Sequence, residues 1–134
     1  MSDTPTLQVE IVTPERSAFS GPATEVLIPA WEGQMGIYPQ HDAILALLRA
    51  GRCSITSSTG VHEFVVGRGF AEVGPTQITI LTEACESKAE VDEDAAKAAL
   101  EAAEHALATV DVRTEEFRQA QLAEEHAKAR LGMR

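Results

Sequence analysis

The stretch HEFVVGRGFAEVGPTQITIL, residues 62–81, contains three short runs rich in β-branched and aromatic residues. These runs are His62–Val66, Gly69–Val73 and Gln77–Leu81, and Gly74-Pro75-Thr76 supplies a turn before the last of them. Short runs of this composition, separated by turn residues, are typical of β-strands. This part of the chain therefore predicts consecutive strands.

The same pattern extends toward the N-terminus. Apolar and polar residues alternate over residues 7–11, which is the period of a half-buried strand. Two more runs follow, Glu25–Ile28 closed by Pro29, and Arg52–Thr56. Turn signals at intervals of roughly 8 to 12 residues favour an antiparallel sandwich or barrel over a parallel sheet with crossover helices.

The composition changes after Glu83, where Ala, Glu, Gln and Lys become dominant. From Ala84 to the end there is one glycine and no proline, so two helices are predicted. We expect Cys85–Val91 to be a linker, Asp92 to cap the first helix and Asp111 to cap the second. A short loop between them makes the pair an antiparallel hairpin.

Each predicted helix carries an apolar stripe made largely of alanine. The stripe residues are Ala96, Leu100, Ala103, Leu107 and Val110 in the first helix, and Phe117, Ala120, Ala127 and Leu131 in the second. Alanine removes little apolar area from water, so the hairpin is expected to be held weakly on the β domain. Both a static helical tail and a hairpin that moves are compatible with this pattern. The fold class is thus a mainly β sandwich over residues 1–86, followed by a linker and helical hairpin over residues 87–134.

The composition excludes several classes of protein. The chain has 134 residues, with 21 acidic and 11 basic side chains and a net charge of -10, which disfavours binding to nucleic acid. No apolar run approaches the roughly 20 residues of a transmembrane helix, and the first six residues do not resemble an export signal, so a cytoplasmic location is expected. Cys53 and Cys85 lack the spacing of a zinc site or a disulfide framework, and we expect two partly buried thiols.

Motifs of enzymatic chemistry are weak. Gly67–Glu72 begins like a dinucleotide-binding motif but has Glu72 in place of the third glycine, and a predicted strand follows it. The sequence contains no phosphate-binding loop, nucleophile elbow or zinc-protease motif. His41 and His62 each adjoin an acidic residue whose side chain would diverge on a strand. A small cytoplasmic sandwich enzyme or ligand carrier that uses either histidine remains the alternative function.

The segment WEGQMGIYPQHDAILALL, residues 31–48, combines turn residues with large apolar side chains. Trp31 and Met35 either form a contact surface or fold inward to close one end of the sandwich, and both possibilities stay open. Gln34, Gln40 and His41 are expected to be exposed.

At these residues the chain resembles the epsilon subunits of F-type ATP synthases, called delta in mitochondria. Glu32–His41 is similar to that family's EGxxGIxPGH loop. Three other segments resemble the family and occur in the same order along the chain: Phe19-Ser20-Gly21, Val91-Asp92 and Ala102–His105. The resemblance implies a ten-stranded sandwich joined to two helices. It also implies a non-catalytic subunit of the central rotor, peripheral to the cytoplasmic face of a bacterial inner membrane.

The resemblance further implies partners and contact residues. The partners are the gamma subunit, the ring of c subunits and, transiently, the alpha and beta subunits of the catalytic head; no cofactor is expected. The residues expected to face the c-ring are Glu32, Gln34, Tyr38 and His41. Gln34 replaces an acidic residue common in the family, and Gln40 replaces a glycine, so the backbone at Gln40 is expected to avoid a positive φ angle.

Some bacterial members of the family bind ATP at the hairpin, through a motif that residues 91–96 match incompletely. Asp92 and Arg130 are retained, whereas Ala95 stands in place of an arginine. We therefore expect ATP binding to be absent or millimolar. Residues 91–134 carry 10 acidic and 6 basic side chains, so inhibition of ATP hydrolysis by an extended hairpin is expected to be weak. A hairpin that serves homodimerisation is a further structural alternative.

Overall fold

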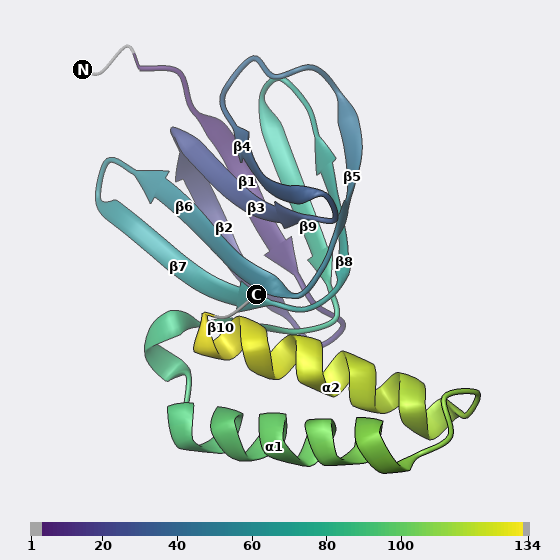
Figure 1. Cartoon of the computed structure of the whole chain (residues 1–134). Helices are drawn as coiled ribbons and strands as arrows, with labels where there is room; N and C mark the ends of the chain where they lie inside the picture. Colours follow the sequence, from purple (N-terminus) through teal and green to yellow (C-terminus); the bar gives the residue numbers. More distant parts are fainter. Residues whose placement is uncertain (1–3, 133–134) are drawn as a thin grey trace.

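The computed structural model describes residues 4–132 and confirms a β domain followed by a helical hairpin (Figure 1). The ten strands are β1 (Leu7–Val12), β2 (Ser17–Ala23), β3 (Glu25–Ala30), β4 (Gly33–Ile37), β5 (Ile44–Leu48), β6 (Gly51–Ser57), β7 (Gly60–Val66), β8 (Gly69–Val73), β9 (Gln77–Thr82) and β10 (Cys85–Ser87). A 3-10 helix, η1 (Lys88–Glu90), leads to α1 (Glu93–Thr109) and α2 (Glu115–Leu131). The expected domain ranges include residues 1–3 and 133–134, which lie outside the described part.

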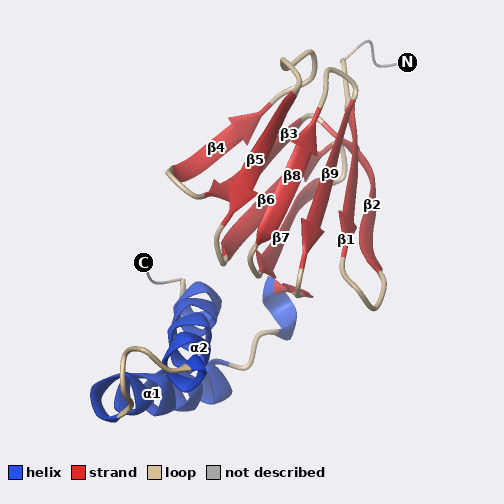
Figure 2. Ribbon diagram, turned by 90° about the vertical axis from the view of Figure 1, so that its right-hand side faces the viewer, coloured by secondary structure: helices blue, strands red, loops and turns tan. Residues whose placement is uncertain are grey.

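All ten strands belong to one sheet that bends into two layers (Figure 2). The strand order is β10-β7-β6-β3-β5-β8-β9-β1-β2, and β4 pairs with β3 alone. Strands β3 and β5 share a single residue pair, Ala30 with Leu48, so the sheet changes layer at this point. The helical hairpin lies beyond one end of the two layers (Figure 2).

One strand pair departs from the antiparallel pattern expected from the sequence. Strands β1 and β9 run parallel, with Gln8 opposite Gln77 and Val12 opposite Leu81. A parallel pair cannot be joined by a tight turn. Here the intervening seven strands make the connection, so the turn spacing along the chain could not predict this pair.

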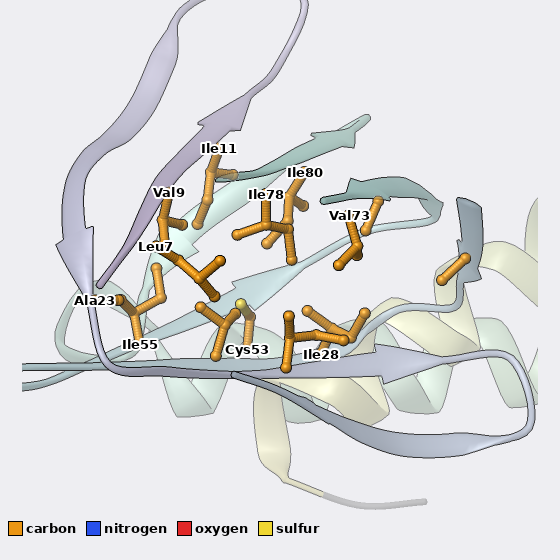
Figure 3. Packing of buried hydrophobic residues seen from close by; sticks show 14 of the residues in the cluster. Leu7, Val9, Ile11, Ala23, Ile28, Cys53, Ile55, Val73, Ile78 and Ile80 are labelled. Atoms are coloured by element: carbon orange, nitrogen blue, oxygen red, sulfur yellow. The ribbon is translucent and has the colours of Figure 1, made fainter. Parts of the chain in front are cut away.

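The hydrophobic core lies between the two layers (Figure 3). Leu7, Val9 and Ile11 point inward from β1 and are completely buried, as their alternation predicts. Ile28 and Ile55 meet them from the other layer and are equally buried. Each such side chain contributes about 1.5–3 kcal/mol to folding, so this cluster carries most of the domain's apolar stabilisation.

Two expected boundaries in the β domain are wrong. Pro29 does not close β3, which continues to Ala30, because the Pro29 carbonyl still accepts a hydrogen bond from the Arg49 N–H. The predicted linker Cys85–Val91 is largely ordered. Its first three residues form β10, which pairs with β7, and the next three form η1.

The two helices of the hairpin bury alanines of the predicted apolar stripes, but the N-cap of α2 is not the predicted residue. The Asp92 carboxylate accepts from the Ala95 N–H and caps α1, as expected. Thr114 caps α2 by accepting from the Phe117 N–H, whereas Asp111 binds Arg113 within the loop and does not cap the helix. The alanines buried in the stripes are Ala96, Ala103, Ala120 and Ala127. Neither helix in residues 4–132 combines the length and apolar character needed to span a membrane.

Candidate functional site

The turn between β3 and β4 presents two of the residues expected to face the c-ring. Glu32 and Gln34 are both exposed there. Gly33 between them has a φ of 141°, a conformation that other residues rarely adopt. Glu32 in the turn and Gln34 at the start of β4 therefore present a carboxylate and an amide to solvent.

Tyr38 and His41 lie at the other end of β4. This strand has five residues and a rise of about 3.3 Å per residue, so it separates the two ends by roughly 13 Å. Interaction with the Glu25 carboxylate raises the pKa of Tyr38. The half-buried His41 ring places Nδ1 2.7 Å from the Asp42 carbonyl oxygen. The structure thus spreads the four predicted residues along β4 and does not gather them at one point.

Gln40 contradicts the expectation drawn from its side chain. Its φ is 72°, the left-handed conformation that a glycine would adopt more easily. The Gln40 N–H donates to the Pro75 carbonyl at 2.7 Å and fixes this geometry. The predicted absence of a positive φ at Gln40 is therefore wrong.

The open question about Trp31 and Met35 has a different answer for each residue. Met35 is partly buried against the core. Trp31 is 49% exposed, and the guanidinium carbons of Arg49 and Arg68 lie 5.5 and 5.2 Å from its ring centroid. Both distances are within the range of a cation–π interaction. Trp31 is thus a surface residue oriented by two cations.

The outer side of β5 and β8 carries an exposed apolar surface, which we call the apolar face. It consists of Leu45, Leu47 and Phe70, which are 67%, 65% and 38% exposed. Leu47 lies directly opposite Phe70 in the sheet register, so two of the three side chains are neighbours. This surface was not predicted from the sequence, although the wholly apolar run of residues 44–48 is a signal that both faces of β5 are apolar.

The two histidines of the alternative function lie in separate parts of the sandwich, His41 after β4 and His62 on β7. His62 is exposed on β7, and its ring packs 5.5 Å from that of Phe19. Within the described residues, neither His41 nor His62 has a side-chain hydrogen bond to a carboxylate or to a nucleophile. That part of the chain also contains no group of three or more His, Cys, Asp or Glu residues that could hold a metal ion.

The two residues retained from the nucleotide motif have partners within the chain. Asp92 caps α1 through its carboxylate. The Arg130 Nε donates to Glu86 Oε1 at 2.6 Å, and the Arg130 carbonyl accepts from Arg52. Arg130 therefore attaches the end of α2 to β10 and β6 of the sandwich.

A second attachment holds the middle of α2. The Glu125 carboxylate accepts from Arg68 Nε at 3.0 Å, from Arg68 Nη2 at 2.9 Å and from the Ala50 N–H at 2.9 Å. Burial would raise the pKa of Glu125, but these hydrogen bonds outweigh burial and lower it. The contact borders a groove of about 550 Å³ between α2 and the turns β3–β4 and β5–β6. Polar contacts therefore supplement the small apolar area provided by alanine.

Comparison with known proteins gives a consistent result. The family model of the ATP synthase delta/epsilon chain, β-sandwich domain, matches residues 6–88. An ATP synthase epsilon chain of Halalkalibacterium halodurans is 35% identical over 127 residues, which cover 95% of this chain and 96% of the relative. An ATP synthase epsilon chain of Syntrophobacter fumaroxidans is 39% identical over 125 residues, covering 93% and 92% of the two chains.

A solved structure shares the whole fold. It is a chain in the mitochondrial ATP synthase of Euglena gracilis, from an assembly of OSCP, F1 and the c-ring. The TM-score is 0.83 at 21% identity, and the match covers 96% of this chain and 81% of the other. The similarity extends across both the sandwich and the hairpin.

Proposed function

Because the chain belongs to the delta/epsilon family of ATP synthase subunits, we propose that it is a non-catalytic rotor subunit of the central stalk. In this role it couples rotation of the c-ring to the gamma subunit and the catalytic head, at the cytoplasmic face of a bacterial membrane. Bacterial relatives that match over more than 90% of this chain support the proposal.

The observation that carries the proposal is the apolar face. Leu45 and Leu47 are each about two thirds exposed on a regular strand, where most apolar residues of a single domain would turn inward. Such a surface is typical of a permanent contact with another subunit. We assign it to the gamma subunit, because a rotor subunit must grip the shaft that it turns with.

Co-purification with the gamma subunit tests this assignment. Leu47→Glu places a charge in the centre of the apolar face and should weaken the complex by roughly 30-fold, which corresponds to about 2 kcal/mol. The matched control is Val61→Glu, because Val61 is 60% exposed on β7 in the other layer. Equal weakening by both variants, or by neither, would contradict the assignment.

We place the c-ring contact along the outer edge of β4. Within residues 4–132 this strand pairs only with β3, so no described strand covers its other edge. Glu32 and Gln34 lie at one end of the edge, and Tyr38 and His41 at the other. A contact that uses all four residues must run along the strand. Gln34 offers a neutral amide there and forms hydrogen bonds without an ion pair.

The coupling ratio, measured as protons pumped per ATP hydrolysed in the assembled complex, tests this placement. Gln34→Ala and Tyr38→Ala should both lower the ratio, because they remove contacts at opposite ends of the edge. Ser58→Ala, in the exposed β6–β7 turn, serves as the control. A loss at only one end would show that the c-ring meets an end of β4 and not its edge.

We propose that the chain binds no ATP at micromolar concentrations. Arg130 is held by Glu86, and Asp92 by its helix cap, so neither is free to bind a phosphate or a ribose. Titration calorimetry with MgATP should give no heat of binding below millimolar concentration. A micromolar affinity would contradict the proposal.

A further inference from the structure

The side chain of Arg68 stands on a rigid base between β7 and β8. The Arg68 carbonyl accepts hydrogen bonds from the Glu83 N–H and the Thr82 hydroxyl. The next residue, Gly69, has no space for a Cβ atom because the Leu81 backbone lies against it. The guanidinium group therefore projects from a backbone that cannot shift easily.

The attachment of the middle of α2 depends on this guanidinium group. Both its Nε and its Nη2 bind Glu125, whose side chain is only 16% exposed. A two-pronged ion pair of this kind fixes orientation as well as position. Loss of the pair would leave a largely buried carboxylate without its main partner, which favours separation of α2 from the sandwich.

The same guanidinium group also lies over the Trp31 ring, at 5.2 Å. Trp31 belongs to the β3–β4 turn, next to Glu32. The indole thus restricts the guanidinium to the region from which it can reach Glu125. The turn, through Trp31, and the hairpin, through Glu125, therefore hold the same side chain.

The geometry points to Arg68 as a coupling residue: Trp31 orients its guanidinium toward Glu125, so any partner that displaces Trp31 weakens docking of the hairpin. The chemistry requires only that the partner binds the β3–β4 turn and moves the indole. That this partner is the c-ring rests on the proposed function. The hairpin would then detach more readily when the turn is occupied.

Exchange of the Arg130 Nε–H with solvent, followed by NMR on the full chain, measures docking independently of these residues. Arg130 and Glu86 form the other attachment of α2, at 2.6 Å, and the variants below leave both residues intact. Glu125→Ala should speed the exchange about tenfold, because the bidentate contact is lost. The control, Glu124→Ala, makes the same change in the same helix but removes only a 3.8 Å contact with Lys128, so the rate should stay within about twofold.

The coupling itself requires a double-mutant cycle. Trp31→Leu should speed the exchange about threefold, which is the scale of an exposed cation–π contact. The double variant of Trp31 and Glu125 should exchange no faster than Glu125→Ala alone, since Trp31 acts only through that pair. Trp31→Phe keeps an aromatic ring and should therefore restore most of the protection of the Arg130 Nε–H against exchange with solvent.

Two results would overturn the inference. One is an unchanged rate in Trp31→Leu, and the other is a double variant whose acceleration equals the product of the single effects. Neither would affect the proposed rotor role, because gamma binding through the apolar face is measured separately with Leu47→Glu.

Discussion

Gln40 adopts a backbone conformation that usually belongs to glycine. Its φ of 72° is unfavourable for a residue with a Cβ atom, at a cost of about 1 kcal/mol. Gln40→Gly should therefore raise the free energy of unfolding by about 0.5–1 kcal/mol, because glycine relieves the strain and keeps the N–H bond to Pro75. Urea unfolding of the purified chain measures this change.

Gln34→Gly is the control for that measurement. Gln34 lies in regular strand β4, where glycine only adds flexibility to the unfolded chain, so stability should fall by about 0.5–1 kcal/mol. A loss of stability in both variants would show that Gln40 is not strained.

Gly69 belongs to the glycine-containing segment that superficially resembles a dinucleotide motif. A Cβ atom there would collide with the backbone carbonyl of Leu81, which cannot move aside as a flexible side chain can. Gly69→Ala should destabilise the chain by about 3 kcal/mol, visible as a lower thermal midpoint. In Gly74→Ala the new atom would lie 3.7 Å from the Gln77 carbonyl oxygen, so a large effect there would contradict this explanation.

The sequence predicts residues whose environment follows from a local pattern. The inward positions of Leu7, Val9 and Ile11 are of this kind, because strand alternation alone determines them. The backbone conformation of Gln40 does not follow from a local pattern, since it is fixed by a hydrogen bond to Pro75, 35 positions away. The positions of Arg49 and Arg68 over the Trp31 ring could not be predicted either. They result from the bend of the sheet, which brings β3, β5 and β8 together.

At the level of whole elements, the attachment of α2 to the sandwich should depend on pH. The Arg68 and Ala50 donors lower the pKa of Glu125 in the docked hairpin below its value in a detached one, and Arg49 acts in the same direction. On α2 itself Glu124 and Lys128 are close by, and Arg52 lies at the end of the helix. Because the pKa of Glu125 is lower in the docked hairpin, its ionised carboxylate stabilises docking at every pH above the pKa of the detached group. This stabilisation is lost as the pH falls through the pKa of the docked group.

Docking should therefore be constant near neutral pH and weaken as the pH falls through the lowered pKa of the Glu125 carboxyl, below its ordinary value of 4.5. The fluorescence of Trp31, the single tryptophan, reports the change during an acid titration. Glu125→Gln should remove this part of the titration, whereas Glu124→Gln should retain it. An identical acid transition in the wild type and Glu125→Gln would contradict this role of Glu125.

Among the elements of residues 4–132, both long helices and the strands β1, β3, β6, β7, β8 and β9 were predicted, whereas β2, β4, β5 and β10 were not. β2 contains Gly21 and Pro22, which an edge strand tolerates because one side needs no partner. The short strand β10 is held by its pairing with β7 and carries no periodic pattern of its own. The sequence predicted Asp111 as the cap of α2, but the cap is Thr114. The Asp111 carboxylate instead accepts hydrogen bonds from Arg113.

At the scale of the whole molecule, the hairpin is expected to be a weak brake. Its net charge of -4, from 10 acidic and 6 basic side chains in residues 91–134, disfavours insertion between acidic surfaces of a catalytic head. ATP hydrolysis by a head lacking its own epsilon subunit should differ by less than about twofold between the full chain and a version ending at Glu90.

The truncated version provides a fair comparison because its core is intact. Every residue of the main hydrophobic cluster lies between Leu7 and Ile80, so removal of both helices leaves the cluster complete. Circular dichroism should show a folded β domain. Hydrolysis several times faster with the truncated chain than with the full chain would establish the hairpin as a strong inhibitor.

The parallel pairing of β1 with β9 imposes an order on biosynthesis. On a translating ribosome β1 can pair early with β2, but its second neighbour is made only when the chain has been extended to Thr82. Until then the inner edge of β1 stays open, and such unpaired edges favour aggregation in partly folded chains. Assembly of the sandwich therefore ends with insertion of its first hairpin beside one of its last strands, a long-range step that slows folding.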